Sequence, residues 1–249
     1  MTNNNHPSYP LPTIQEVVCE IRFRLDTNWN IALYGEYFKK IEDLFPTFEP
    51  VAVPIFIEIT NSTDAPSLAV PLAMRYRHIN RNLLVQLSEN RIAVNILPIY
   101  PGWNQVMQDI VYIWGKLCEI VTPAEITRIG LRYINGIERG TKNETLSRWL
   151  RPNDYIPSTV LKSSSGFAAQ ILTYLDEQNR LQVRLTDQLS GTDGLGKFLF
   201  DIDRIIEKRM GIDLDSLLGN VTHLHQDVWD VFQSAKSEDL ERLLKGELI

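Results

Sequence analysis

Cysteine is scarce in this chain, and long apolar runs are absent. The 249 residues include two cysteines, Cys19 and Cys118, which stand far apart and form neither a C-x-x-C pair nor a zinc-ligand ladder. Such sparse cysteine is typical of a reducing compartment, where cysteines are small buried hydrophobic residues. No apolar run approaches the roughly 20 residues that a transmembrane helix requires. The polar, proline-rich first dozen residues lack the basic and apolar regions of a signal peptide. We therefore expect a soluble cytoplasmic protein.

No complete nucleotide-binding or nucleophile motif is present either. G-x-S-x-G is absent. Residues 191–197 have the spacing G-x-x-x-x-G-K of a phosphate-binding loop, but Phe198 stands where a magnesium-binding Ser or Thr belongs. An apolar, strand-like run follows instead of the helix that would cradle phosphate. We interpret this segment as a glycine-rich connection between strands.

The two neighbouring histidines do not form a metal-binding pair. His223 and His225 lie in a helical apolar pattern, which places them roughly 200° apart around the helix and prevents them from sharing an ion. His223 and Asp227 have the spacing of an ordinary i,i+4 surface pair. The sequence predicts no metal site and no cofactor.

The overall composition is that of a folded domain with an acidic balance. Hydrophobic residues make up 44% and charged residues 22% of the chain. The formal net charge is -6 at pH 7. An acidic balance argues against wholesale coating of nucleic acid or of an anionic membrane. Nucleic acid is therefore a disfavoured partner, and we expect no membrane contact.

Apolar periodicity predicts alternating strands and helices. Period-2 patterns and turn signals predict strands at 14–25, 53–59, 69–78, 82–88, 91–97, 126–138, 167–175, 181–189 and 197–206. Helical spacing predicts helices at 29–45, 103–121, 144–150 and 214–244, the last broken near Gly219 and Ser237. Trp103, Trp114 and Trp229 fall in helical core stripes and are expected to pack.

The two halves of the chain follow the same order of elements. Each half is predicted to run strand, helix, three or four strands, helix. The predicted fold is therefore α+β, with two pseudo-repeated halves whose antiparallel sheets pack with helices. Residues 1–12 are predicted to form a disordered tail, 13–123 the first half, and 124–249 the second half, intimately packed on the first. A groove between the halves is the default ligand site.

Arginines recur in pairs along three predicted strands. The pairs are Arg22 with Arg24, Arg75 with Arg77, and Arg128 with Arg132. Each pair shares one face of its strand because side chains alternate with period 2. Lined up in one groove, these residues would bind phosphate, a nucleotide or an acidic partner. The alternative is a sheet with one wet face, where arginine pairs with Glu16, Glu20 or Glu138.

Paired carboxylates suggest a second chemistry. Asp201 and Asp203 stand two residues apart in a predicted strand and share a face. Such pairs hold magnesium or manganese in phosphoryl-transfer sites, and Asp176 and Asp187 on the neighbouring hairpin are candidate additional ligands. The alternative is a solvated strand edge.

Five segments of the chain together resemble a known family. They are residues 10–23, 83–96, the Y-P-G-W at 100–103, the R-I-G-L-R-Y-I-N at 128–135, and L-H-Q-D-V-W-D-V-F at 224–232. The resemblance is to a sporadically distributed bacterial family of uncharacterised proteins of about this length, and it covers essentially the whole chain. Its most specific motif is the R-x-G-L-R-Y-I-N strand. The patchy distribution implies a role in antiviral defence or another mobile-element system, and the resemblance supplies no catalytic residues.

We therefore predict a non-enzymatic binding or accessory protein that recognises a protein partner or an anionic ligand through Arg-bearing sheet faces. The candidate binding residues are Arg22, Arg24, Arg75, Arg77, Arg128, Arg132 and Asn135. The alternative is a metal-dependent phosphodiesterase or nuclease that uses Asp201 and Asp203. The sequence leaves the oligomeric state open and is compatible with a homodimer.

Overall fold

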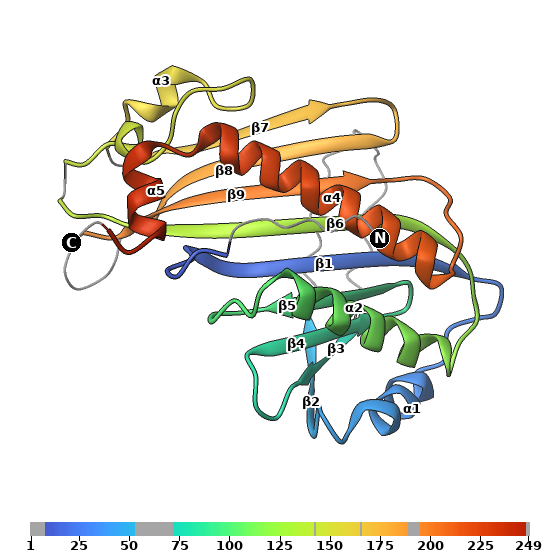
Figure 1. Ribbon diagram of the computed structural model, residues 1–249. Helices are drawn as coiled ribbons and strands as arrows, with labels where there is room; N and C mark the ends of the chain where they lie inside the picture. The colour runs from blue at the N-terminus through green and yellow to red at the C-terminus, as the bar shows by residue number, and fades with distance from the viewer. Residues whose placement is uncertain (1–7, 53–71, 142, 165, 189–194, 248–249) are drawn as a thin grey trace, which may run out of the picture.

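A single antiparallel sheet forms the framework of the protein. The computed structural model describes residues 8–52, 72–141, 143–164, 166–188 and 195–247 (Figure 1). The strands are β1 (Ile14–Leu25), β2 (Thr47–Ala52), β3 (Leu72–Arg77), β4 (Leu83–Ser88), β5 (Arg91–Ile96), β6 (Pro123–Glu138), β7 (Ala168–Tyr174), β8 (Asn179–Gln188) and β9 (Lys197–Ile206). Within these residues they pair in the order β2-β3-β4-β5-β1-β6-β9-β8-β7.

The helices are placed between or after these strands. They are α1 (Ala32–Ile41), α2 (Trp103–Cys118), α3 (Ser158–Leu161), α4 (Leu214–Ala235) and α5 (Glu238–Leu244), with a 3-10 turn at Leu146–Arg148. The predicted α+β class is confirmed. None of the described helices combines the length and apolar composition needed to cross a bilayer.

The expectation of more than one sheet is wrong, because the first strands of the two halves pair with each other. β1 and β6 run antiparallel, with Val17 opposite Tyr133, Cys19 opposite Leu131 and Ile21 opposite Ile129. Both strands are long, and they occupy the centre of the sheet. Backbone hydrogen bonds therefore join the halves into one continuous layer.

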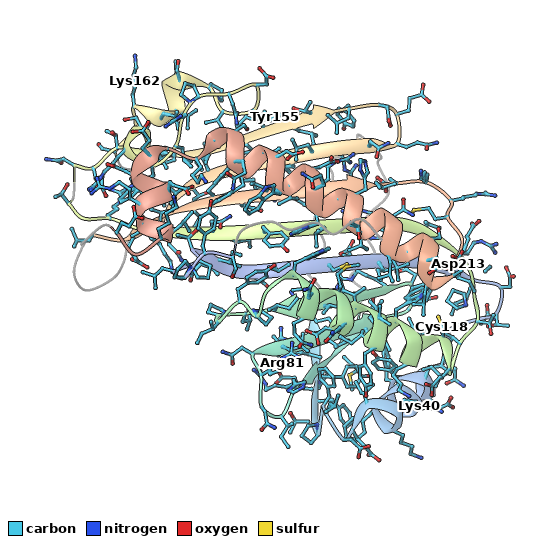
Figure 2. All side chains as sticks on the ribbon, viewed as in Figure 1. Lys40, Arg81, Cys118, Tyr155, Lys162 and Asp213 are labelled. Carbon is cyan, nitrogen blue, oxygen red and sulfur yellow. The ribbon has the colours of Figure 1, made fainter. Side chains whose placement is uncertain are left out.

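α2 and α4 lie on one face of the sheet and contact each other (Figure 1). The core lies between this helical layer and the sheet. Odd-numbered residues of β1 such as Val17, Cys19 and Ile21 are buried there, and Trp114 of α2 packs edge-on against Phe23 at 5.9 Å. Arg81, labelled below α2 in Figure 2, ties the β3–β4 turn to the helix layer because its Nη1 donates to Asp109 Oδ1 of α2 at 2.8 Å.

Each of the two C-terminal helices begins directly after a residue whose side chain caps its N-terminus. Asp213, labelled at the start of α4 in Figure 2, accepts a hydrogen bond from the Ser216 N–H at 2.8 Å. The predicted break at Ser237 is confirmed, since its hydroxyl caps α5 through the Leu240 N–H at 3.1 Å. The predicted break at Gly219 is wrong, because α4 continues through it. One helical glycine costs only about 1 kcal/mol relative to alanine, which burial of the flanking apolar stripe offsets.

The remaining differences concern short elements. β2 was not predicted; it contains Pro50 and lies at the sheet edge, where proline is tolerated. The predicted helix at 144–150 is only a 3-10 turn. The predicted strand at 53–59 lies outside the described residues, as do positions 189–194 of the glycine-rich segment. Lys197 begins β9, so a strand follows that segment, in agreement with the interpretation of it as a connection.

Candidate functional site

The sheet divides its side chains between two different surfaces. On the side opposite α2 and α4, Arg22 stands across from Arg128 of β6 and from Arg91 of β5. Arg75 reaches the same face through the register Arg75–Gln86–Ala93–Glu20, because directly paired residues share a face. We call this surface the arginine face and define it by Arg22, Arg24, Arg75, Arg77, Arg91, Arg128, Arg132 and Arg184. It contains all six predicted arginines, with Arg91 and Arg184 in addition.

Glu20 is the centre of one group on the arginine face. Its carboxylate accepts hydrogen bonds from Arg22 Nε at 3.0 Å, from Arg91 Nη1 at 3.2 Å, and from Arg128. Burial opposes ionisation of Glu20, but attraction to Arg128, Arg22 and Arg91 outweighs it and lowers the pKa of this carboxyl below its usual value. The predicted pairing of arginine with Glu20 is therefore present. Glu16 instead accepts from Asn95 Nδ2 at 2.8 Å.

Asp201 is the centre of a second group. Arg132 binds it through two parallel hydrogen bonds, Nε to Oδ1 at 2.8 Å and Nη2 to Oδ2 at 2.6 Å, and Arg184 Nη1 donates to Oδ2 at 3.0 Å. Asp203 shares this face but approaches Arg184 only to 4.0 Å. Burial raises the pKa of Asp203 above its usual value, although Arg132, Arg184 and Arg128 attract its ionised form.

The other two predicted acidic ligands do not join Asp201 and Asp203. Asp187 lies on the opposite face of β8, where it forms a buried ion pair with Arg139. Asp176 lies in the β7–β8 turn and accepts from the Gln178 N–H at 2.7 Å. Among the residues that the structure describes, no group of three or more His, Cys, Asp or Glu side chains could hold a metal ion. His223 forms the predicted i,i+4 pair with Asp227, at 3.6 Å.

The helix-covered side of the same central strands contains an aromatic cavity. Its volume is about 250 Å³, and it lies between β1, β6, the start of α2, and α4. We call it the aromatic cavity and define it by the rings of Tyr9, Tyr100, Trp103, Tyr133, Trp229 and Phe232. His225 of α4 joins the wall by stacking on Trp103, with ring centroids 3.7 Å apart and planes 4° from parallel.

Polar groups in the cavity are few among the described residues that line it. Asn135 is buried; its Oδ1 accepts from the Thr13 hydroxyl at 3.1 Å and its Nδ2 donates to the Phe200 carbonyl at 3.3 Å. The hydroxyls of Tyr100 and Tyr133 lie 3.2 Å apart. Burial raises the pKa of Tyr100 to about 12 and raises that of Tyr133 well above its usual value, so both phenols stay neutral.

Sequence reasoning found this cavity only in part. Asn135 was a predicted binding residue, but it lies in the cavity and not on the arginine face. Trp114 packs in the core as predicted, whereas Trp103 and Trp229 line the cavity. A usable signal was present, since four of the five segments on which the family resemblance rests contribute to the lining. No sequence pattern indicates that these four segments come together in the fold to form one cavity.

Comparisons with known proteins add no identification. A scan against models of known protein families finds no match, and a search among curated proteins returns no relative. The family resemblance therefore stays a prediction.

Proposed function

We propose that this chain is a non-enzymatic binding or accessory protein that recognises an acidic partner protein through the arginine face. The observation that carries the proposal is a concentration of guanidinium groups on this face, most of which share their carboxylate partner with another guanidinium. Three carboxylates, those of Glu20, Glu49 and Asp201, serve seven guanidinium groups as their nearest ion-pair partners. The seven are Arg22, Arg91 and Arg128 on Glu20, Arg75 and Arg77 on Glu49, and Arg132 and Arg184 on Asp201.

A guanidinium that shares its carboxylate with another guanidinium keeps N–H donors that a partner could use. One carboxylate neutralises one guanidinium, and each guanidinium carries five N–H donors in a planar fork. The side chains of Arg22, Arg24 and Arg77 are 45%, 51% and 56% exposed. These exposed guanidinium groups stand in a chain whose formal net charge is -6. An acidic protein surface would complement them and gain charge-assisted hydrogen bonds.

The proposal is tested by retention of the full chain on immobilised poly-L-glutamate in a salt gradient. The triple variant Arg22→Gln, Arg24→Gln, Arg77→Gln is expected to elute at lower salt than wild type. The matched control, Lys39→Gln, Lys40→Gln, Arg242→Gln, removes three exposed basic side chains from α1 and α5 and is expected to elute like wild type. Equal shifts in both variants, or no retention of wild type, would contradict the proposal. Stronger retention on immobilised DNA would contradict the choice of a protein partner.

We also infer that the two halves arose by internal duplication. The order of strands supports this: in each half the first strand (β1 or β6) is central and pairs with the last strand (β5 or β9), and earlier strands follow outward. We further propose that the protein is cytoplasmic and acts in bacterial antiviral defence or in another mobile-element system. These proposals rest on the free state of Cys19 and Cys118 and on the family resemblance.

A further inference from the structure

We propose that the aromatic cavity binds a small, uncharged, planar heteroaromatic molecule of two fused rings, such as a purine base. This site is separate from the arginine face, so the inference does not depend on the proposed function.

The walls favour a flat aromatic ligand. Rings from four separate parts of the chain surround the space, represented by Tyr9, Trp103, Tyr133 and Trp229. Aromatic pairs attract in stacked or edge-on geometry with centroids roughly 4.5–7 Å apart. The wall is already assembled, since Trp103 stacks on His225 and Tyr9 stacks on Trp229 at 6.3 Å. A ligand would therefore enter without the entropic cost of ordering these side chains.

The volume limits the ligand to about two rings. An apolar protein cavity of roughly 150 Å³ accommodates benzene. The aromatic cavity is larger, at about 250 Å³. This additional space corresponds to a second fused ring, whereas a nucleoside or a tricyclic molecule would extend beyond it.

The polar groups match a ring edge that both donates and accepts hydrogen bonds. An amide side chain has two N–H donors and two acceptor lone pairs, and within the described residues Asn135 uses one of each. The Tyr100 and Tyr133 hydroxyls share a single hydrogen bond. One of their two hydrogens is therefore available to a ligand acceptor, and Tyr133 is only 6% exposed. Buried donors without an acceptor are costly, so an acceptor on the ligand would stabilise the complex.

The absence of charge among the lining residues selects against charged ligands. No Asp, Glu, Lys or Arg of the described part of the chain lines the cavity. A phosphate or carboxylate placed there would lose its hydration without an ionic partner. We therefore expect the free base and not its nucleotide.

The test uses isothermal titration calorimetry of the full chain, because indole emits in the same range as Trp103 and Trp229 and would mask a change in their fluorescence. The chain is titrated with adenine, indole and AMP. We expect saturable binding of adenine, at least tenfold weaker binding of indole, which offers a single donor, and at least tenfold weaker binding of AMP. Absence of saturable binding of adenine, or tighter binding of AMP than of adenine, would overturn the proposal.

Two variants test whether adenine binds in the aromatic cavity. Trp229→Ala is expected to weaken adenine binding at least tenfold, whereas Trp29→Ala, which removes a similarly half-buried tryptophan outside the cavity, is expected to leave it unchanged. Asn135→Leu is expected to abolish the preference for adenine over indole while indole still binds, a result that an unfolded variant would not give. Equal loss with Trp229→Ala and Trp29→Ala, or an unchanged preference in Asn135→Leu, would contradict a site in the aromatic cavity.

Discussion

Arg132 and Tyr133 are neighbours in β6, but their side chains act on opposite sides of the sheet. The Arg132 guanidinium binds Asp201 on the arginine face, while the Tyr133 hydroxyl meets that of Tyr100 in the aromatic cavity. The period of 2 in a β-strand is the cause. The R-x-G-L-R-Y-I-N segment therefore contributes Arg128 and Arg132 to one surface and Tyr133 and Asn135 to the other.

Glu20→Gln is expected to destabilise the fold by about 2–3 kcal/mol, because three guanidinium groups lose their shared counter-charge in a partly buried setting. The free energy of unfolding in urea at pH 7 measures the change. Glu36→Gln, at an exposed position of α1, serves as the control and should alter stability by less than about 0.5 kcal/mol.

The same variant has a defined pH dependence. Since the folded-state pKa of Glu20 is lowered, its stabilising contribution is present above the unfolded pKa and is lost as pH falls through the folded pKa. The difference between wild type and Glu20→Gln should therefore shrink as pH is lowered below 4.5, the ordinary value of this carboxyl. A difference that stays constant down to pH 2 would show that the charge of Glu20 is not what stabilises the protein.

Asp203→Asn is expected to act in the opposite direction. The pKa of Asp203 is raised in the folded state, so folding favours its protonated form and the ionised carboxylate costs stability. This cost is absent at low pH and develops as pH rises through the folded pKa. The variant should consequently unfold at higher urea concentration than wild type at pH 7 and at nearly the same concentration at pH 3. Destabilisation at pH 7 would contradict this assignment.

Asp187→Asn is expected to cost about 3–5 kcal/mol, since it removes the charge of a buried carboxylate that is paired with a buried guanidinium. The side chains of Arg139 and Asp187 are only 1% and 0% exposed. Thermal and urea unfolding would measure the loss. Asp230→Asn, on the exposed surface of α4, provides the comparison and should be close to neutral.

Two glycine-to-alanine changes should have opposite signs. Gly102 precedes α2 with φ 90° and ψ 156°, a conformation that disfavours a side chain by roughly 1–3 kcal/mol. Gly219 lies inside α4, and no neighbouring group comes within 4 Å of the position that a β-carbon would occupy, so alanine there should stabilise by about 1 kcal/mol. Calorimetric melting of both variants gives the comparison. Gly102→Ala should also weaken adenine binding, because the next residue, Trp103, lines the aromatic cavity. Equal effects of the two changes would contradict the role of backbone conformation at Gly102.

Local sequence patterns predicted most elements because period and turn chemistry act within a few residues. The strands at 14–25 and 197–206 have the predicted limits. Pairing of β1 with β6 was not predicted. Each of these strands could instead have been the edge strand of its own sheet, and no local pattern distinguishes that arrangement from one continuous sheet. The aromatic cavity was missed for a related reason. Trp103 and Trp229 have the same helical spacing as buried core residues, and only their tertiary surroundings distinguish a cavity wall from a packed core.

The central pairing of β1 with β6 has a consequence for synthesis of the chain. β1 leaves the ribosome before β6, so the strand that covers one of its edges follows only after α2. During this interval β1 presents unpaired backbone groups and one apolar face, which invite pairing with other nascent chains. Chaperone dependence during translation, together with slow refolding after dilution from denaturant, is the expected result of so distant a contact at the centre of the sheet.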